Sequence, residues 1–346
     1  MDALLNRLCE TPGVSGRERQ IRAVIREIAE ATGFFDEIRE DVLGNLLCLR
    51  HGQGVGVAGP RRILLAAHMD QAGFLVSHVG QDGAVYLHPV GTYDPACLAS
   101  QPVLVVPGQG ATLRGTLHLA REPVHTAPDA RSDPTTLSDV FVELGLPPQK
   151  VAEQVRPGDM VVFDAPLRVV GEDLAGAGLD DRIGCWALLA SLPMITNTQA
   201  ELIFAFTVQE ELGSRGAAVL GTSLRPDIAL IAETVVSCCV PGVPPQRHVT
   251  RPGAGIALQV ADSSLLSDES MIETAETATR AASLPVQRSL MQGGGQDGAL
   301  LQRSGSGVRV LALGCPLRFM HTALEHAHRD DVSAYPHVLA ALVNAL

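Results

Sequence analysis

The chain has few aromatic residues and almost no lysine. Aromatic residues make up 3 % of its 346 residues, and Lys150 is the only lysine. A single lysine argues against chemistry that depends on a lysine nucleophile. Apolar residues still account for 46 %, which is an ordinary globular composition and excludes a disordered or fibrous chain. A chain of this length can bury a large core and is expected to hold two domains.

Long apolar runs and positive charge are also missing. No run of about 18 apolar residues could span a bilayer, and the start, Met1 to Leu5, lacks the basic segment of a signal peptide. The 26 basic residues are outnumbered by 38 acidic ones, a net charge of −12, which excludes nucleic acid and anionic membranes as partners. The seven cysteines are odd in number and form no Cys-x-x-Cys pair, so reduced thiols and a cytoplasmic location are predicted.

The hydrophobic pattern predicts an α/β fold with an insertion. A helix from Leu4 to Ala31, interrupted at 11–16, is followed by strands at 45–50 and 63–67. From 73 to 164 short apolar stretches alternate with Gly and Pro, which indicates a small inserted β-domain resembling a barrel. We therefore predict a mixed, largely parallel sheet flanked by helices, built from residues 1–72 and 165–346.

The second half of the chain alternates helices and strands. The predicted elements are a helix at 181–192, strands at 202–208, 228–232 and 308–313, and helices at 213–220, 267–282 and 332–346. Within the insertion, 125–138 is polar and is predicted to be a loop.

The string Gly54-x-Gly56-x-x-Gly59 matches a dinucleotide-binding fingerprint. Pro60 and another strand follow it where that fingerprint needs a helix, so we reject a dinucleotide site.

Imidazole and carboxylate side chains follow or flank five separate apolar runs. They are His68, Asp180, Glu211, Glu233 and His321. Each alone has an ordinary explanation, such as a surface turn at His68, a helix cap at Asp180 or a solvated loop at Glu211. Sites in such folds lie at the carboxyl ends of strands, so these side chains are expected to meet. Two imidazoles and three carboxylates suit two divalent ions, which could be zinc, cobalt or manganese.

Three further features could serve such a site. Glu210 stands beside a candidate ligand, where a general base for a metal-activated water is needed. Asp70 can accept a hydrogen bond from the distal nitrogen of His68 and fix its tautomer. The run Gly293-Gly294-Gly295-Gln296-Asp297-Gly298 could wrap a ligand or form a flexible turn.

At these residues the chain resembles the M42 family of metallo-aminopeptidases, the glutamyl and tetrahedral aminopeptidase group. The resemblance covers nearly the whole chain. Its motifs are Thr11-Pro12-Gly13-Val14-Ser15-Gly16, Leu43-Gly44-Asn45, Ala67-His68-Met69-Asp70, Arg156-Pro157-Gly158-Asp159, Leu179-Asp180-Asp181-Arg182-Ile183-Gly184, Gln209-Glu210-Glu211-Leu212-Gly213-Ser214-Arg215-Gly216, Gly293-Gly294-Gly295-Gln296-Asp297, His321 and Asp330-Asp331-Val332.

The resemblance implies a role for each motif. Asp180 would bridge two metals, with His68 and Glu233 completing one shell and Glu211 and His321 the other. Asp70 would orient His68, Glu210 would be the base, and Asp181 would follow a cis peptide bond. Gly295, Gln296 and Asp297 would contact substrate. The inserted domain would serve assembly into a homo-oligomer, from a dimer to a dodecamer.

Three departures from the family pattern bear on specificity. Gln71 stands where the family has Glu, Glu233 where it has Asp, and Gln296 where it has Thr. The sequence predicts a two-metal aminopeptidase that hydrolyses amino-terminal residues of short peptides. A hydrolase of a modified small amide or N-blocked dipeptide-like metabolite is the first alternative. A catalytically silent binding or scaffold protein is the second.

Overall fold

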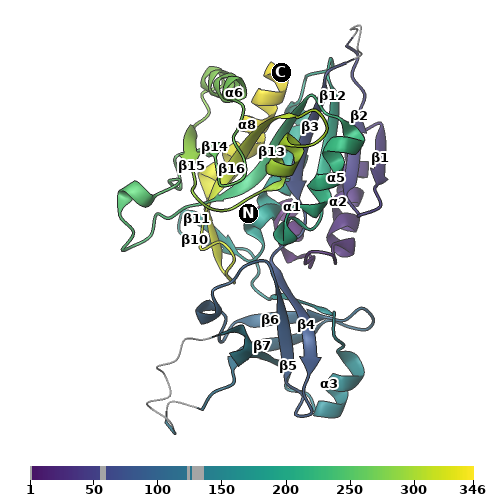
Figure 1. Ribbon diagram of the computed structural model, residues 1–346, viewed down its shortest axis with the longest axis vertical. Coiled ribbons are helices and arrows are strands. Elements are labelled where there is room, and N and C mark those ends of the chain that lie inside the picture. The colour runs from purple at the N-terminus through teal and green to yellow at the C-terminus, as the bar shows by residue number, and fades with distance from the viewer. Residues whose placement is uncertain (1, 55–59, 123–124, 127–135) are drawn as a thin grey trace.

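The computed structural model describes residues 2–54, 60–122, 125–126 and 136–346, and within them an eleven-stranded mixed sheet forms the larger part of the molecule (Figure 1). Its strands are β1 (Glu37–Glu40), β2 (Leu46–Arg50), β3 (Arg62–His68), β10 (Arg168–Val170), β11 (Asp173–Gly176), β12 (Glu201–Thr207), β13 (Ile228–Val236), β14 (Ile256–Ala261), β15 (Val286–Leu290), β16 (Arg309–Arg318) and β17 (Glu325–His328). The main order is β1-β2-β12-β3-β13-β16-β17-β11-β10, and β14 pairs with β15 and β16.

The centre of this sheet is parallel, as predicted. β12, β3, β13 and β16 run in the same direction. The strands outside them pair antiparallel, except that β14 and β15 are parallel to each other. β3 shows why the centre is apolar on both sides. Its Ile63 and Leu65 pack into one core and its Leu64 and Ala66 into another. Successive strand residues point to opposite faces, so a strand covered on both faces needs a continuous apolar run.

Helices cover both faces of the sheet. One face is covered by α1 (Ala3–Glu10), α2 (Arg19–Thr32), α4 (Leu179–Ser191), α6 (Glu269–Ala281) and α8 (Arg329–Ala345). The other is covered by α5 (Arg215–Leu224) and α7 (Asp297–Gln302). The amphipathic pattern of α2 places Ile21 and Ile25 in the first core, at the helical spacing read from the sequence.

A closed six-stranded barrel lies below the sheet in Figure 1, within the range predicted for the insertion. Its strands are β4 (Gly73–Val79), β5 (Val85–Val90), β6 (Pro102–Val106), β7 (Leu113–Leu119), β8 (Val140–Glu143) and β9 (Met160–Phe163), and α3 (Pro148–Gln154) packs against it. The strand order is β4-β5-β8-β7-β6-β9. Phe74, Val103 and Val161 are fully buried in its interior, so the barrel has a core of its own.

Several sequence predictions need correction or lie outside the described residues. β13 continues to Val236, so Glu233 lies inside a strand and not at its end. The sequence alone also allowed His321, His326 and His328 to form a solvated helix face, but His326 and His328 belong to strand β17. The rejected glycine string and most of the predicted loop at 125–138 fall outside the described residues.

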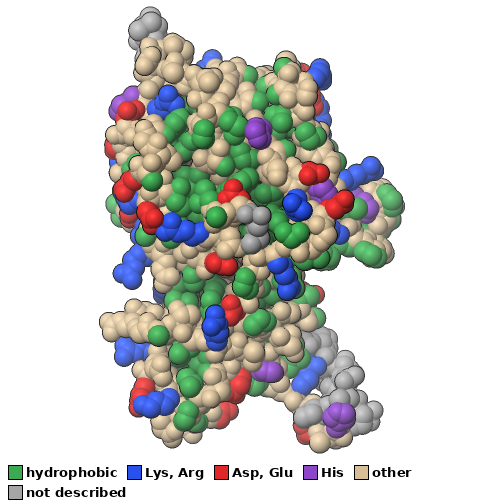
Figure 2. All heavy atoms as spheres, turned by 180° about the vertical axis from the view of Figure 1, so that it is seen from behind, with side chains coloured by type: hydrophobic (Ala, Val, Ile, Leu, Met, Phe, Trp, Pro, Cys, Tyr) green, Lys and Arg blue, Asp and Glu red, His purple; other side chains and the backbone are tan. Residues whose placement is uncertain are grey.

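The rear face of the molecule carries mixed charge. On the rear face, acidic and basic side chains are interspersed and form no continuous basic field (Figure 2). In the described part of the chain, no helix is both long and apolar enough to cross a membrane.

Candidate active site

The five predicted ligands converge at one edge of the parallel centre. His68 is the last residue of β3, Glu211 lies in a short 3-10 turn (Glu210–Leu212) directly after β12, and His321 follows β16. Glu233 reaches the same level inside β13, because β13 pairs with β3 only as far as Ile231 and Ala66 and then extends past it. Asp180 enters from the first turn of α4.

The ligands form two groups that share Asp180. Nε2 of His68 lies 3.3 Å from Asp180 Oδ1 and 3.7 Å from Glu233 Oε2. Nε2 of His321 lies 3.4 Å from Asp180 Oδ2 and 3.3 Å from Glu211 Oε2. In each group the candidate ligand atoms lie within 4.8 Å of one another. The division is the one that the resemblance implied.

Two hydrogen bonds hold Asp180 in place. The bond between Asp180 and Asp181 is cis, at the position singled out from the resemblance. The hydroxyl of Thr234 donates to Asp180 Oδ1 at 2.7 Å, and the amide of Asp180 donates to Glu325 Oε2 at 3.2 Å. The two carboxylate oxygens of Asp180 face different histidines, Oδ1 toward His68 and Oδ2 toward His321.

Asp70 approaches the distal nitrogen of His68 with its backbone and with its side chain. The distal nitrogen of His68, Nδ1, lies 3.1 Å from the backbone carbonyl of Asp70 and 3.6 Å from its carboxylate. The carboxylate also accepts hydrogen bonds from the amides of Glu210, at 3.1 Å, and Glu211, at 3.2 Å, and from Ser15 Oγ, at 2.6 Å. The side chain of Asp70 thus fixes the turn that carries the candidate base and a candidate ligand.

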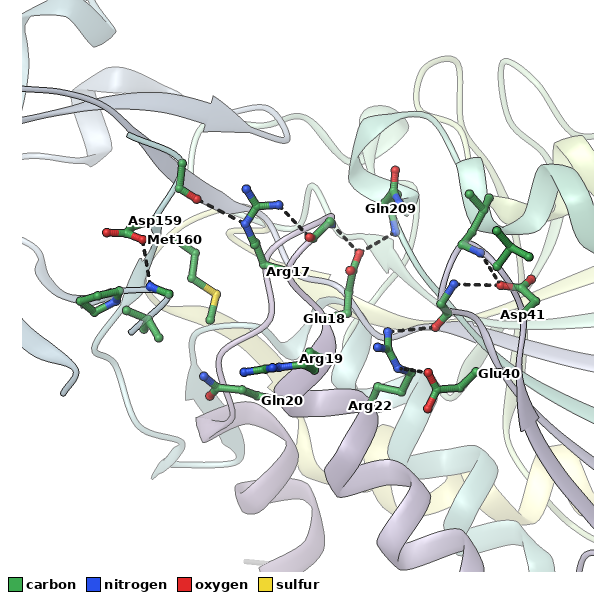
Figure 3. Close-up of a pocket in the computed structure, with 18 residues that line it drawn as sticks. Arg17, Glu18, Arg19, Gln20, Arg22, Glu40, Asp41, Asp159, Met160 and Gln209 are labelled. Carbon is green, nitrogen blue, oxygen red and sulfur yellow. Dashed lines mark hydrogen bonds and ion pairs between the residues drawn. The ribbon is translucent and has the colours of Figure 1, made fainter. Parts of the chain in front are cut away.

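Glu18 supports the same turn from behind. Its Oε1 accepts hydrogen bonds from the amides of Gly16, at 2.6 Å, and Gln209, at 3.1 Å (Figure 3). Gln209 has a φ of 56°, in the left-handed region that non-glycine residues rarely adopt. Two buried carboxylates therefore hold three successive backbone amides, from Gln209 to Glu211.

Glu210 occupies an environment suited to a proton acceptor. Burial, together with the nearby carboxylates of Asp297 and Glu211, raises its pKa to about 8, although His68 opposes the shift. Ser214 Oγ donates to Glu210 Oε1 at 3.0 Å, which leaves Oε2 to receive a proton. A base with a pKa near neutrality is deprotonated in a useful fraction of molecules and still binds a proton strongly enough to take it from water.

The charge of the cluster favours a bound cation. Burial raises the pKa of Glu233 well above its usual value, and the carboxylates of Asp181 and Asp180 add to the shift. Burial alone would lower the pKa of His321, but the carboxylates of Asp180 and Glu211 raise it to about 12. Glu211 Oε1 is buried and accepts no hydrogen bond from the described residues. Buried acids crowded in this way are stable when a positive charge neutralises them, so the donors fit divalent ions.

A pocket of about 580 Å³ opens over these groups. Gly295 and Gln296 line it, whereas Asp297 is 1 % exposed and accepts a hydrogen bond from the hydroxyl of Thr207 beneath the surface. Among the described residues, the lining does not include Gln71, whose Oε1 accepts from the buried guanidinium of Arg182 at 3.2 Å. The substitution at Gln71 therefore alters a buried contact and not the pocket wall.

Sequence reasoning missed several residues that support the site, above all Glu325 and Tyr335. Glu325 is 3 % exposed and accepts hydrogen bonds from the amides of Asp180 and His321. The alternation Glu325-His326-Ala327-His328 is a strand pattern that places Glu325 on the buried face, and it could have revealed this residue. Tyr335 carried no local signal, because it contacts Glu233 from α8.

Known proteins resemble the chain over most of its length. The sequence profile of the M42 glutamyl aminopeptidase family matches residues 44–337. The lysyl aminopeptidase of Pyrococcus furiosus is 28 % identical, covering 99 % of this chain and 96 % of the relative.

Two solved structures share the fold. An aminopeptidase from the archaeon Desulfurococcus kamchatkensis has a TM-score of 0.93 at 26 % identity, covering 99 % of this chain and 94 % of the other. The TET1 peptidase of Pyrococcus horikoshii, which can assemble into a tetrahedron or a large octahedral shell, has a TM-score of 0.86 at 28 % identity, covering 99 % and 98 %. The family match spans well over half of the chain and confirms the resemblance read from the sequence motifs. This chain belongs to the M42 glutamyl aminopeptidase family and is a peptide hydrolase of that family.

Proposed function

We propose that this chain is a two-metal aminopeptidase that removes amino-terminal residues from short peptides. The observation that carries the proposal is the pair of ligand groups joined by Asp180, with Glu210 beside them. His68, Glu233 and Asp180 would hold one ion, and Glu211, His321 and Asp180 the other. Their nitrogen and oxygen donors suit zinc or cobalt, and also manganese. Bound ions would polarise the scissile carbonyl and lower the pKa of a water molecule.

The residues of the chain account for the proton movements. A water oxygen attacks the carbonyl carbon while Glu210 Oε2 takes the water proton. Glu210 then delivers this proton to the amide nitrogen as the carbon–nitrogen bond breaks, so the products are a free amino acid and a shortened peptide. Asp70 and Glu18 keep the Gln209–Glu211 turn in place during both transfers.

Replacing Glu210 tests this mechanism. Glu210→Gln keeps the shape of the side chain but cannot accept a proton, so the rate should fall at least about 10²-fold, the usual contribution of a general base. Bound metal should remain near the wild-type amount. Glu211→Gln is the matched control and should instead weaken metal binding. If the two variants exchange these behaviours, the base and the ligand have been assigned the wrong way round.

The amino-terminal end of the substrate is the finer part of the proposal. The name of the Pyrococcus furiosus relative supports a free amino terminus, whereas Glu233 and Gln296, two of the departures from the family pattern, line the pocket. Competition between free and N-acetylated forms of one dipeptide amide decides between an aminopeptidase and a hydrolase of N-blocked amides. Preferential cleavage of the acetylated form would refute the aminopeptidase and leave the metal-dependent hydrolase intact.

Assembly into a homo-oligomer is proposed as well. The shell formed by the TET1 peptidase of Pyrococcus horikoshii supports it, and the barrel is the part expected to join subunits. Sedimentation should show a dimer or a larger particle, up to a dodecamer. A strict monomer at micromolar concentration would contradict this part of the proposal.

A further inference from the structure

A short segment of the barrel reaches the candidate metal centre. Gly91, Thr92 and Tyr93 follow β5, and the backbone carbonyl of Thr92 lies 2.9 Å from Nδ1 of His321. A carbonyl oxygen can only accept, so this contact places the proton of a neutral His321 ring on Nδ1. Nε2, which faces Asp180 and Glu211, then keeps its lone pair for an ion.

Gly91 sits against the other ligand of the same group. A Cβ atom built at Gly91 would lie 2.9 Å from Glu211 Oε2 and 3.0 Å from the Cβ of Ala72. Oε2 is the oxygen that faces His321. Gly91 also has a φ of 88°, which a residue with a side chain rarely adopts. The absence of a side chain at position 91 therefore gives the Glu211 carboxylate its room.

Tyr93 anchors the segment to the barrel core. Its ring stacks on Phe74 with the centroids 4.6 Å apart and meets Phe163 edge-on at 6.0 Å. The same ring lies 6.2 Å from the ring of His321. A segment fixed in the barrel thus contacts His321 through two of its residues and Glu211 through a third.

We propose that Gly91, Thr92 and Tyr93 are positioning residues for the ion held by Glu211, His321 and Asp180, so that the barrel helps to build the metal centre in addition to any role in assembly. The two ligands that belong to the His68–Glu233 group alone lie on the central strands β3 and β13, so we expect this group to depend less on the barrel. This inference rests on the proposed two-metal function, since it assumes that both groups bind ions.

The test compares two glycine substitutions within the barrel range. Gly91→Ala adds a methyl group against Glu211, whereas Gly110→Ala adds one at a φ of 103° with no atom within 4 Å. Both variants place a side chain at a positive φ, and only the first presses on a ligand. Metal-free proteins are titrated with Co²⁺ in a calorimeter, and bound metal is counted by elemental analysis.

Wild type and Gly110→Ala should bind two Co²⁺ ions per chain. Gly91→Ala should keep one ion at wild-type affinity and bind the second at least about tenfold more weakly, the usual effect of losing support for a ligand. Thermal unfolding of the metal-free forms should be similar for the two variants. Equal binding of both ions by Gly91→Ala and Gly110→Ala would overturn the proposal.

A second variant covers the case in which Gly91→Ala fails to fold. Tyr93→Leu preserves an apolar side chain against Phe74 but removes the ring beside His321. It should also weaken only the second ion, and unchanged affinity for both ions would again overturn the inference. If wild-type protein itself binds no Co²⁺, the proposed two-metal function fails. If wild type binds two ions and neither variant weakens one, only the inference fails.

Discussion

The two halves of the candidate metal centre are built in different ways. His68 and Glu233 lie on neighbouring strands of the parallel centre, and the side chain of His68 is 2 % exposed. His321 and Glu211 lie in connections after strands, and the side chain of His321 is 25 % exposed. His321 also has a φ of 59°. The sheet therefore supplies one half directly, whereas the other half needs supports from outside its own segments.

Two of those supports, Thr92 and Asp70, come from distant parts of the chain, and the third, Glu325, lies four residues after His321. The carboxylate of Glu325 accepts a hydrogen bond from the amide of His321 at 2.8 Å, and the backbone carbonyl of Thr92 lies within hydrogen-bond distance of the His321 ring nitrogen Nδ1. The carboxylate of Asp70 accepts a hydrogen bond from the amide of Glu211. On the sheet side, the amide of Glu233 donates to the hydroxyl of Tyr335 at 2.8 Å, inside a strand already paired with β16. The comparison teaches that a metal ligand in a loop needs several hydrogen bonds to hold it in place, whereas a ligand in a strand needs few.

The largest expected effect is the loss of both ions at once. Asp180 belongs to both halves, so Asp180→Ala should abolish binding of both ions and reduce turnover to background. Elemental analysis of the purified variant, with the exposed Asp330→Ala as control, gives the measurement. Retention of either ion at wild-type occupancy would show that the halves do not share this ligand.

A smaller effect is expected at Glu325, which should separate the halves. Its Oε1 accepts from His321 and its Oε2 from Asp180, so a carboxamide at this position would turn an N–H group toward one of the two amides. Glu325→Gln should weaken the ion held with His321 by about 10- to 100-fold and the other ion less.

The control is Glu172→Gln, which makes the same substitution at a side chain that is 90 % exposed. Calorimetric titration with Co²⁺ measures both affinities. An equal loss at the two sites would mean that Glu325 acts through Asp180 and not through His321.

The same contrast explains what the sequence could reveal. His68, Glu211 and His321 were predictable because the carboxyl ends of neighbouring parallel strands meet at one edge of the sheet. Glu233 was assigned to a strand end because polar residues usually mark such ends, but β13 continues as a buried strand past the end of β3. Thr92 could not be found, since it contributes a backbone carbonyl and its side-chain identity carries no signal.

The prediction of the fold also fails where a feature leaves no local signal in the sequence. The parallel centre and the barrel texture were readable from continuous and alternating apolar runs, and the barrel strands fall inside the predicted range 73–164. β14 and β15 were not predicted. β15 has only one buried residue, Ser289, so its pairing with β14 supplies the structure that its own pattern does not indicate. Long-range pairing of this kind has no local signature.

The smallest expected effect lies at Tyr335, on the sheet side. Its hydroxyl accepts from the amide of Glu233 and lies 2.6 Å from the carbonyl of Leu313, to which it donates. Tyr335→Phe leaves that amide without its partner in the buried centre, which costs about 1–3 kcal/mol of folding free energy. Denaturant unfolding of the metal-free protein measures this loss. Tyr86→Phe in the barrel is the matched control, because the Tyr86 hydroxyl makes no hydrogen bond to the described residues.

In Tyr335→Phe, affinity for the ion held with His68 should change by less than about tenfold, below the usual effect of losing a support, because strand pairing still holds Glu233 in place. A larger loss of affinity than in Glu325→Gln would reverse the comparison and show that the sheet half is the more dependent one.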